Sequence, residues 1–207
     1  DELNPRVRLG GPDCSQPYDI ALLNVSAMSF GALSANAIWA LNAGAARGGF
    51  AHDTGEGAIS PYHLRGGGDL IWEIGSGYFG CRDAEGRFDP ASFAEKATMP
   101  SVKGVSVKLS QGAKPGLGGV LPGSKVSTEI AATRGVPVGQ TVVSPPAHSA
   151  FQTPVELAEF IATLRKLSGG KPVGFKLCVG SRSEFLSICK GILATGIAPD
   201  FVIVDGA

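Results

Sequence analysis

The feature that most constrains the fold is a regular alternation of strand-like runs and helical segments along the chain. Two of the runs, 173–178 and 201–204, are almost continuously apolar, as expected for strands buried on both faces of a parallel sheet. An alternation of this kind predicts parallel βαβ units. Six strands are expected, at 24–29, 50–52, 71–74, 105–109, 173–178 and 201–204.

Glycine-rich and polar segments follow the ends of these strands. This arrangement is typical of the catalytic face of a (β/α)8 barrel and also of an open, doubly wound sheet. About six strands would make an incomplete barrel, and the sequence stops directly after a strand. We therefore expect a chain truncated at its C-terminal side, with a lead-in segment at 1–23 and one α/β domain at 24–207.

Helix signals separate the strands. Ser34 is placed to cap one helix, and Thr153-Pro154 has the cap-then-proline order that begins another. Helices are expected at 35–46, 90–97, 127–133, 155–167 and 183–195.

The bulk properties exclude several classes of function. The 207 residues fit one domain, and the formal net charge is zero, so nucleic acid and anionic membranes are not expected partners. Neither a secretion signal nor an apolar span of transmembrane length is present, which makes the cytoplasm the expected location. The three histidines and four cysteines lack the spacing of metal ligands, so no metal site is predicted in this chain.

The segment from Lys108 to Lys125 is the longest irregular stretch. It contains five glycines, two prolines and three lysines, one of them Lys114, together with Gln111. Long loops in compact domains commonly serve as lids or binding loops, and backbone amides with lysines can cradle an anion. The alternative is a solvated connection whose glycines only relieve turns. The spacing matches neither a P-loop nor a dinucleotide-binding fingerprint.

Two lysines lie inside apolar strands, Lys108 and Lys176. An unpaired ammonium is costly to bury, so each should serve a cofactor, a Schiff base or an ion pair with a nearby carboxylate. Glu56, between two glycines, could meet a ligand or face water. The histidines His52, His63 and His148 are expected to be hydrogen-bonded structural residues.

Six motifs together resemble the central, FMN-binding domain of glutamate synthases, and most nearly the short stand-alone FMN-binding glutamate synthase-like proteins. The resemblance extends from about Cys14 onward. The motifs are SAMSFGALS (26–34), HDTGEGAISPYH (52–63), IWEIGSGYFG (71–80), VKLSQGAKPGLGGVLPGSKV (107–126), SPPAHS (144–149) and VGFKLC (173–178).

The resemblance implies a (β/α)8 TIM-type barrel that carries FMN at the strand ends, beside a 3Fe-4S cluster whose ligands lie outside this chain. It implies an oxidoreductase acting on CH–NH2 donors, which aminates 2-oxoglutarate, or a related 2-oxo acid, through an imine reduced by hydride from FMN. It also implies an electron donor, either ferredoxin or a pyridine-nucleotide reductase subunit, and is compatible with a homo-oligomer. The truncated chain alone is expected to be inactive.

The resemblance assigns site residues by their place in these motifs. Catalytic roles fall on Glu56, Lys108 and Lys176, and substrate contacts on Glu56, Lys114 and Lys125. The implied cofactor contacts are Ala27, Met28, Ser29, Gly31, Lys108, Gln111 and Lys176.

Two departures from the large synthases bear on the substrate. Ala58 replaces a glycine after the GEG motif, and Val120 replaces a glutamine associated with the keto acid. These changes weaken the expectation of 2-oxoglutarate as the substrate more than the expectation of FMN as the cofactor. Two other functions fit the same residues: an aldolase-type barrel with a Schiff base at Lys176, and a non-catalytic module for anion binding or assembly.

Overall fold

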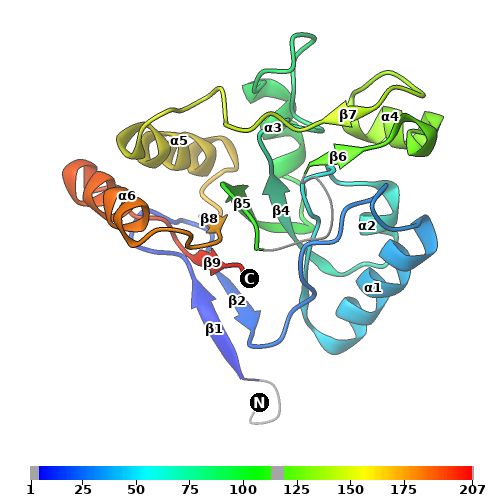
Figure 1. Cartoon of the computed structure of the whole chain (residues 1–207). Helices are drawn as coiled ribbons and strands as arrows, with labels where there is room; N and C mark the ends of the chain where they lie inside the picture. The colour runs from blue at the N-terminus through cyan, green and yellow to red at the C-terminus, as the bar shows by residue number, and fades with distance from the viewer. Residues whose placement is uncertain (1–4, 113–118, 207) are drawn as a thin grey trace.

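The computed structural model describes residues 5–112 and 119–206. Its centre is a curled, five-stranded parallel sheet (Figure 1). The strand order is β3 (Ala51–Asp53), β4 (Asp69–Ile74), β5 (Val102–Lys108), β8 (Val173–Leu177) and β9 (Val202–Val204). Val25 adds a parallel bridge to His52 on β3, so five of the six predicted runs are sheet strands and the first is a single bridge. The architecture is α/β and consistent with a partial TIM barrel.

In the described part of the chain, six helices connect the strands, and they form an arc around the sheet in Figure 1. The hydroxyl of Ser34 caps the first by accepting a hydrogen bond from the Ala37 amide. Thr153 caps another with Pro154 at its first position, as predicted, and Glu156 completes a reciprocal cap that was not predicted. The helices are α1 (Ala35–Gly48), α2 (Pro61–Arg65), α3 (Pro90–Ala97), α4 (Thr128–Arg134), α5 (Pro154–Leu167) and α6 (Arg182–Thr195).

Within the described residues, two small antiparallel strand pairs outside the central sheet were not predicted from the sequence. In the first, β1 (Arg6–Leu9) pairs with β2 (Tyr18–Ala21) within the expected lead-in segment. In the second, β6 (Val120–Leu121) pairs with β7 (Val142–Val143), and a 3₁₀ turn at Gly123–Lys125 follows β6. The five-residue α2 was also missed, because an element that short carries almost no periodicity.

The two faces of the sheet differ in chemistry. One face packs against α3 and α5: Trp72 stacks on Phe93 with ring centroids 5.3 Å apart, and Leu164 and Phe175 are buried in the same cluster. Burying each of these large side chains stabilises the fold by roughly 2–3 kcal/mol. Because side chains alternate along a strand, Glu73 faces the opposite, inner side of the curl.

Register places the polar residues of that inner face in rows. Glu73 is aligned with Ser106, and Lys108 with Lys176. Two lysines thus sit side by side on neighbouring strands, which requires carboxylates close by.

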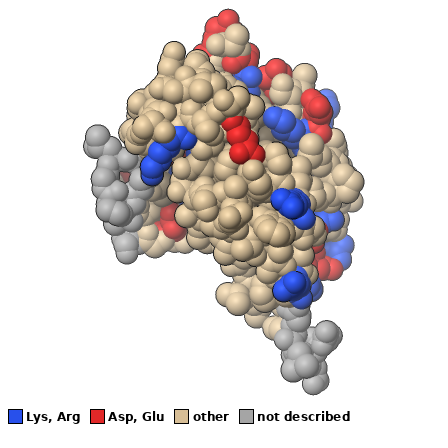
Figure 2. Space-filling model, turned by 90° about the vertical axis from the view of Figure 1, so that its right-hand side faces the viewer, with Lys and Arg blue, Asp and Glu red and all other residues tan. Residues whose placement is uncertain are grey.

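None of the described helices is long and apolar enough to cross a membrane. On the face shown in Figure 2, basic and acidic side chains are interspersed.

Candidate functional site

The carboxyl ends of the parallel strands bring the predicted polar residues to one edge of the sheet. Asp53 ends β3, Lys108 ends β5, Lys176 lies near the end of β8, and Asp205 follows β9. These four residues therefore lie at one edge of the sheet although they are far apart in the sequence, as expected for alternating strands and helices.

Lys176 is held by two carboxylates. Its ammonium lies 3.3 Å from Glu73 Oε2 and 3.6 Å from Asp205 Oδ2. Burial alone would lower the pKa of Lys176, but the charges of Glu73, Asp53 and Asp205 outweigh it, and the pKa is raised. Asp205 also accepts a hydrogen bond from the Gly112 amide at 3.0 Å, which ties the start of the long loop to the end of β9. We call Glu73, Lys176 and Asp205 the floor of the site.

Lys108 has different partners, and they come from loops. Its ammonium lies 3.4 Å from Glu56 Oε1 and donates to Gln111 Oε1 at 2.6 Å. Gly75 leaves the space that Glu56 occupies, since a Cβ there would lie 2.7 Å from Glu56 Oε2. We call Glu56, Lys108 and Gln111 the rim of the site.

Arg134 is a further cation close enough to Glu56 to interact with its charge. It ends α4, is buried, and donates from Nη2 to the Phe30 carbonyl at 3.1 Å. Burial lowers the pKa of Arg134, and the charge of Glu56 opposes this. A Cβ at Gly57 would lie 2.8 Å from Arg134 Nη2, so the second glycine of the GEG motif makes room for the guanidinium.

The segment predicted to contact the cofactor, 27–31, lies against the loop that carries Glu56. The Met28 amide donates to the Asp53 carbonyl at 3.2 Å. Gly55 has φ +65°, and a Cβ there would lie 2.8 Å from the Ser29 amide nitrogen. Only glycine combines that conformation with so close an approach.

His63 fixes the carbonyl of Met28. Its Nδ1 accepts from the Ser60 amide at 3.1 Å, which leaves the proton on Nε2 for the bond of 2.9 Å to Met28 O. Burial lowers the pKa of His63, in keeping with this neutral form. The prediction of a hydrogen-bonded structural histidine is confirmed.

His148 fixes the backbone of Lys108 in the same way. Its Nε2 lies 2.8 Å from Lys108 O and its Nδ1 lies 3.0 Å from the Tyr78 hydroxyl. That hydroxyl accepts from the Ala150 amide at 3.1 Å, so its own proton is available to His148 Nδ1. The SPPAH motif thus anchors the end of β5, a link that spacing along the chain did not reveal.

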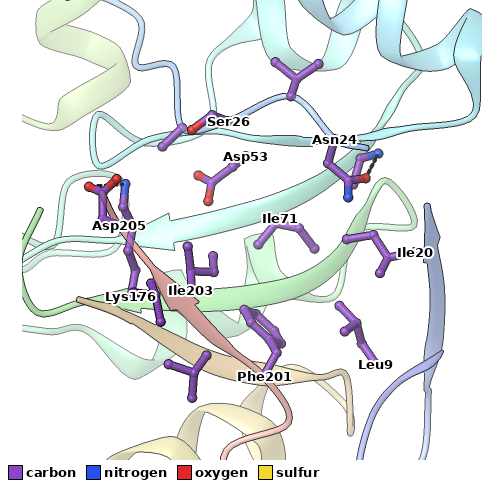
Figure 3. Close-up of a pocket in the computed structure, with 15 residues that line it drawn as sticks. Leu9, Ile20, Asn24, Ser26, Asp53, Ile71, Lys176, Phe201, Ile203 and Asp205 are labelled. Atoms are coloured by element: carbon purple, nitrogen blue, oxygen red, sulfur yellow. Dashed lines mark hydrogen bonds and ion pairs between the residues drawn. The ribbon is translucent and has the colours of Figure 1, made fainter. Parts of the chain in front are cut away.

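A cavity of about 390 Å³ adjoins the floor on the inner side of the sheet (Figure 3). Asp53, Lys176, Asp205 and Ser26 line one end of the cavity, and Asn24 lies towards the other end. The remaining walls are mainly apolar, and include Leu9, Ile20, Ile71, Phe201 and Ile203.

The outcomes for the predicted residues differ. Glu56, Lys108 and Gln111 form one contact group, Lys176 lies on the neighbouring strand, and 27–31 lies against the loop of Glu56. Lys125 is exposed in the 3₁₀ turn, and no described ion pair joins it to the site. Lys114 lies outside the described residues. No group of potential metal ligands occurs within 5–112 and 119–206.

The sequence of this chain is similar to those of known proteins. A family model described as "Conserved region in glutamate synthase" matches residues 14–207. The glutamate synthase large subunit-like protein YerD of Bacillus subtilis is 40% identical over 201 residues, which cover 96% of this chain and 38% of that protein. The archaeal-type glutamate synthase [NADPH] of Thermotoga maritima is 34% identical over 183 residues, or 87% of this chain and 32% of the relative.

The same conserved region occurs in a much larger protein. The glutamate synthase [NADPH] large chain of Azospirillum brasilense is 33% identical over 185 residues, 86% of this chain and 11% of its own length. This chain therefore spans well under half of these relatives. With the family model matching nearly all of it, the chain belongs to the glutamate synthase family.

Proposed function

We propose that this chain is the flavin-carrying part of a glutamate synthase-like oxidoreductase that aminates 2-oxoglutarate, or a related 2-oxo acid, and reduces the resulting imine. The observation that carries this proposal is the convergence of the family's motifs on one edge of the sheet. Glu56, Lys108 and the segment at 27–31 come from three motifs distant in sequence and lie in one neighbourhood.

The residues present fit FMN. An isoalloxazine ring has an apolar body and an electron-rich edge of nitrogen and carbonyl groups. The cavity offers mainly apolar walls and one cationic end at Lys176. When bound, FMN would supply the hydride for reduction of the imine. Ala27, Met28, Ser29 and Gly31 would line its face, with Lys108, Gln111 and Lys176 as polar partners.

The chain's own side chains have separable tasks in this proposal. Lys176, kept protonated by its two carboxylates, places a fixed positive charge where a reduced ring accumulates negative charge. Lys108 and Glu56 orient the substrate at the rim, and exchanging their mutual ion pair for substrate contacts requires only side-chain movement. Lys114 and Lys125 remain proposed carboxylate partners of the 2-oxo acid.

The state of Lys176 argues against the aldolase alternative. A Schiff base forms through the neutral amine, which needs a lowered pKa. Lys176 instead has a raised pKa and two carboxylate partners. Borohydride in the presence of a carbonyl substrate should therefore leave Lys176 unmodified.

The activity is tested on the native protein that contains this sequence. The protein is chemically reduced without oxygen and mixed with a panel of 2-oxo acids, each with ammonia, while the visible absorbance of flavin is followed. At least one acid should reoxidise the flavin faster than buffer alone. If none does, the amination chemistry is wrong and only flavin binding remains.

Val120 bears on which acid reacts. It lies on β6, which pairs with β7, and is 38% exposed, and its side chain offers no polar contact to a keto acid. We propose slower reaction with 2-oxoglutarate than with a less polar 2-oxo acid.

We further propose that the protein is cytoplasmic and that a 3Fe-4S cluster is held by residues outside this sequence. Its electron donor is proposed to be ferredoxin or a pyridine-nucleotide reductase subunit.

A further inference from the structure

Among the described residues, Asp53 is the carboxylate of the site without an ion-pair partner. It ends β3, is buried, and points into the cavity that Lys176 and Asp205 also line (Figure 3). Its Oδ1 accepts from the Gly55 amide at 2.9 Å. Within 5–112 and 119–206, Glu56, Glu73 and Asp205 each have an ion pair with a lysine, whereas Asp53 has none.

The described charges around Asp53 balance without it. Glu73 on β4, Glu56 in the loop after β3, and Asp205 after β9 are the neighbouring carboxylates. Lys108 on β5, Lys176 on β8, and Arg134 of α4 behind Glu56 are the cations. His52, on β3 itself, contacts Asn42 of α1 instead. In this part of the chain three cations match three carboxylates, and an ionised Asp53 would add an unmatched buried charge.

We propose that Asp53 is held as the neutral carboxylic acid, so that its O–H and the Lys176 ammonium present two hydrogen-bond donors to a ligand in the cavity. A carboxylate at Asp53 would instead attract a cation. The neutral acid selects a ligand with electron-rich acceptor atoms, such as a ring edge of nitrogen and carbonyl oxygen. Only the identity of that ligand as FMN rests on the proposed function.

The physical basis is burial reinforced by a like charge. Burial and the nearby charge of Glu73 raise the pKa of Asp53 well above its usual range, and the Gly55 amide and the two lysines oppose this only in part. A protonated carboxyl has the shape of a carboxamide and, like it, both donates and accepts. Asp53→Asn should therefore reproduce the native state of this residue.

The protonation state is measured directly in the native protein that contains this sequence. Aspartate labelled with ¹³C at the side-chain carboxyl is incorporated, and the Asp53 resonance is identified by its loss in Asp53→Asn. That resonance should remain in the protonated position at about pH 7. Asp83 is the matched control, since hydrogen bonds from Arg87 lower its pKa, and it should be ionised at about pH 5. An Asp53 already ionised at about pH 6 would overturn the proposal.

Unfolding gives a second readout. The pKa of Asp53 is raised by folding. The stability that its protonated carboxyl contributes to the folded state is therefore complete below the unfolded pKa of about 4, and it is lost as pH rises towards the folded pKa. The carboxamide of the Asp53→Asn variant does not titrate. The unfolding equilibrium constant of the native protein, relative to that of Asp53→Asn, should therefore rise about tenfold per pH unit across this window. A ratio independent of pH would contradict the proposal.

Ligand recognition is tested with FMN as the probe. Asp53→Asn should keep the FMN dissociation constant within about threefold, whereas Asp53→Ala, which lacks the donor, should raise it about tenfold. If Asp53→Asn weakens binding as much as Asp53→Ala, the donor role is wrong. If the unmodified protein takes up no FMN, the proposed function and the recognition half of this inference both fail, while the carboxyl titration still decides the protonation state.

Discussion

The floor and the rim each pair a lysine with carboxylates, but they are built differently. At the floor, Lys176 and Glu73 come from strands of one sheet and their side chains are 9% and 1% exposed, while Asp205 follows β9 and is 34% exposed. At the rim, Lys108 meets Glu56 and Gln111 from loops, and the side chains of its ion pair with Glu56 are 12% and 18% exposed. Strand residues fix a charge in place, whereas loop residues can exchange partners. In the proposed function, the fixed charge of the floor therefore suits a permanent cofactor, which Lys108 and Gln111 also contact, and Glu56 suits a substrate that comes and goes.

The largest expected effect is at the floor. Lys176→Met leaves Glu73 buried without a cation, which should lower the free energy of unfolding by about 3 to 5 kcal/mol. Lys103→Met is the matched control, because its pair with Asp69 is 35% and 39% exposed, and it should cost less than about 1 kcal/mol. Urea denaturation measures both. Equal losses would mean that the floor is no more fixed than a surface pair.

A second prediction asks whether the rim depends on its backbone anchor. His148→Ala removes the partners of Lys108 O and the Tyr78 hydroxyl, which should cost about 2 kcal/mol. His148→Gln can still donate to Lys108 O and should recover part of this loss. Denaturation of both variants provides the comparison. If alanine and glutamine behave alike, the hydrogen bond to Lys108 does not support the rim.

The third prediction contrasts Glu73 of the floor with His63, outside the rim, by the sign of their pH dependence. His63, which holds the segment beside the rim, has a pKa lowered by burial. The stability that neutral His63 contributes to the fold is complete above its unfolded pKa of about 6.5. As the pH is lowered, this stability decreases by up to about 1.4 kcal/mol per pH unit. Glu73 has a pKa raised by burial despite Lys176, so its contribution is complete below about pH 4.3 and is lost as pH rises.

One variant of each residue, His63→Gln and Glu73→Gln, measures these opposite pH dependences of stability. The unfolding free energy of His63→Gln, minus that of the unchanged protein, should increase as pH falls below about 6.5. The same difference for Glu73→Gln should increase as pH rises above about 4.3. Parallel pH profiles for the two variants would contradict a lowered pKa at His63 together with a raised pKa at Glu73.

The smallest effect on stability is expected at Glu56. Its pair with Lys108 is partly exposed and Lys108 keeps Gln111, so Glu56→Gln should change the free energy of unfolding by less than about 1 kcal/mol. The KM for a 2-oxo acid should nevertheless change, because Glu56 is proposed to orient the substrate. A loss of stability as large as that of Lys176→Met would place Glu56 in the floor.

The sequence predicted the parts of this site that depend on strand pattern. A lysine within an apolar strand implies a charged inner face, and both Lys108 and Lys176 do form ion pairs. It did not predict partners that meet only through long-range packing, such as His148 with Lys108, or Arg134 with Phe30. Those contacts depend on how loops of different βα units lie against one another, which no local period encodes.

The central claim is that the cation fixed at the floor faces a bound flavin. The most direct test is the visible absorption of the native protein containing this sequence, followed by FMN titration of the flavin-free form and its Lys176→Met and Lys103→Met variants. We predict a flavin spectrum that FMN restores after removal, and binding weakened by about tenfold or more in Lys176→Met alone, the loss expected for a desolvated charge-assisted contact. A folded, colourless protein that takes up no FMN, or equal affinity in all three proteins, would contradict the claim.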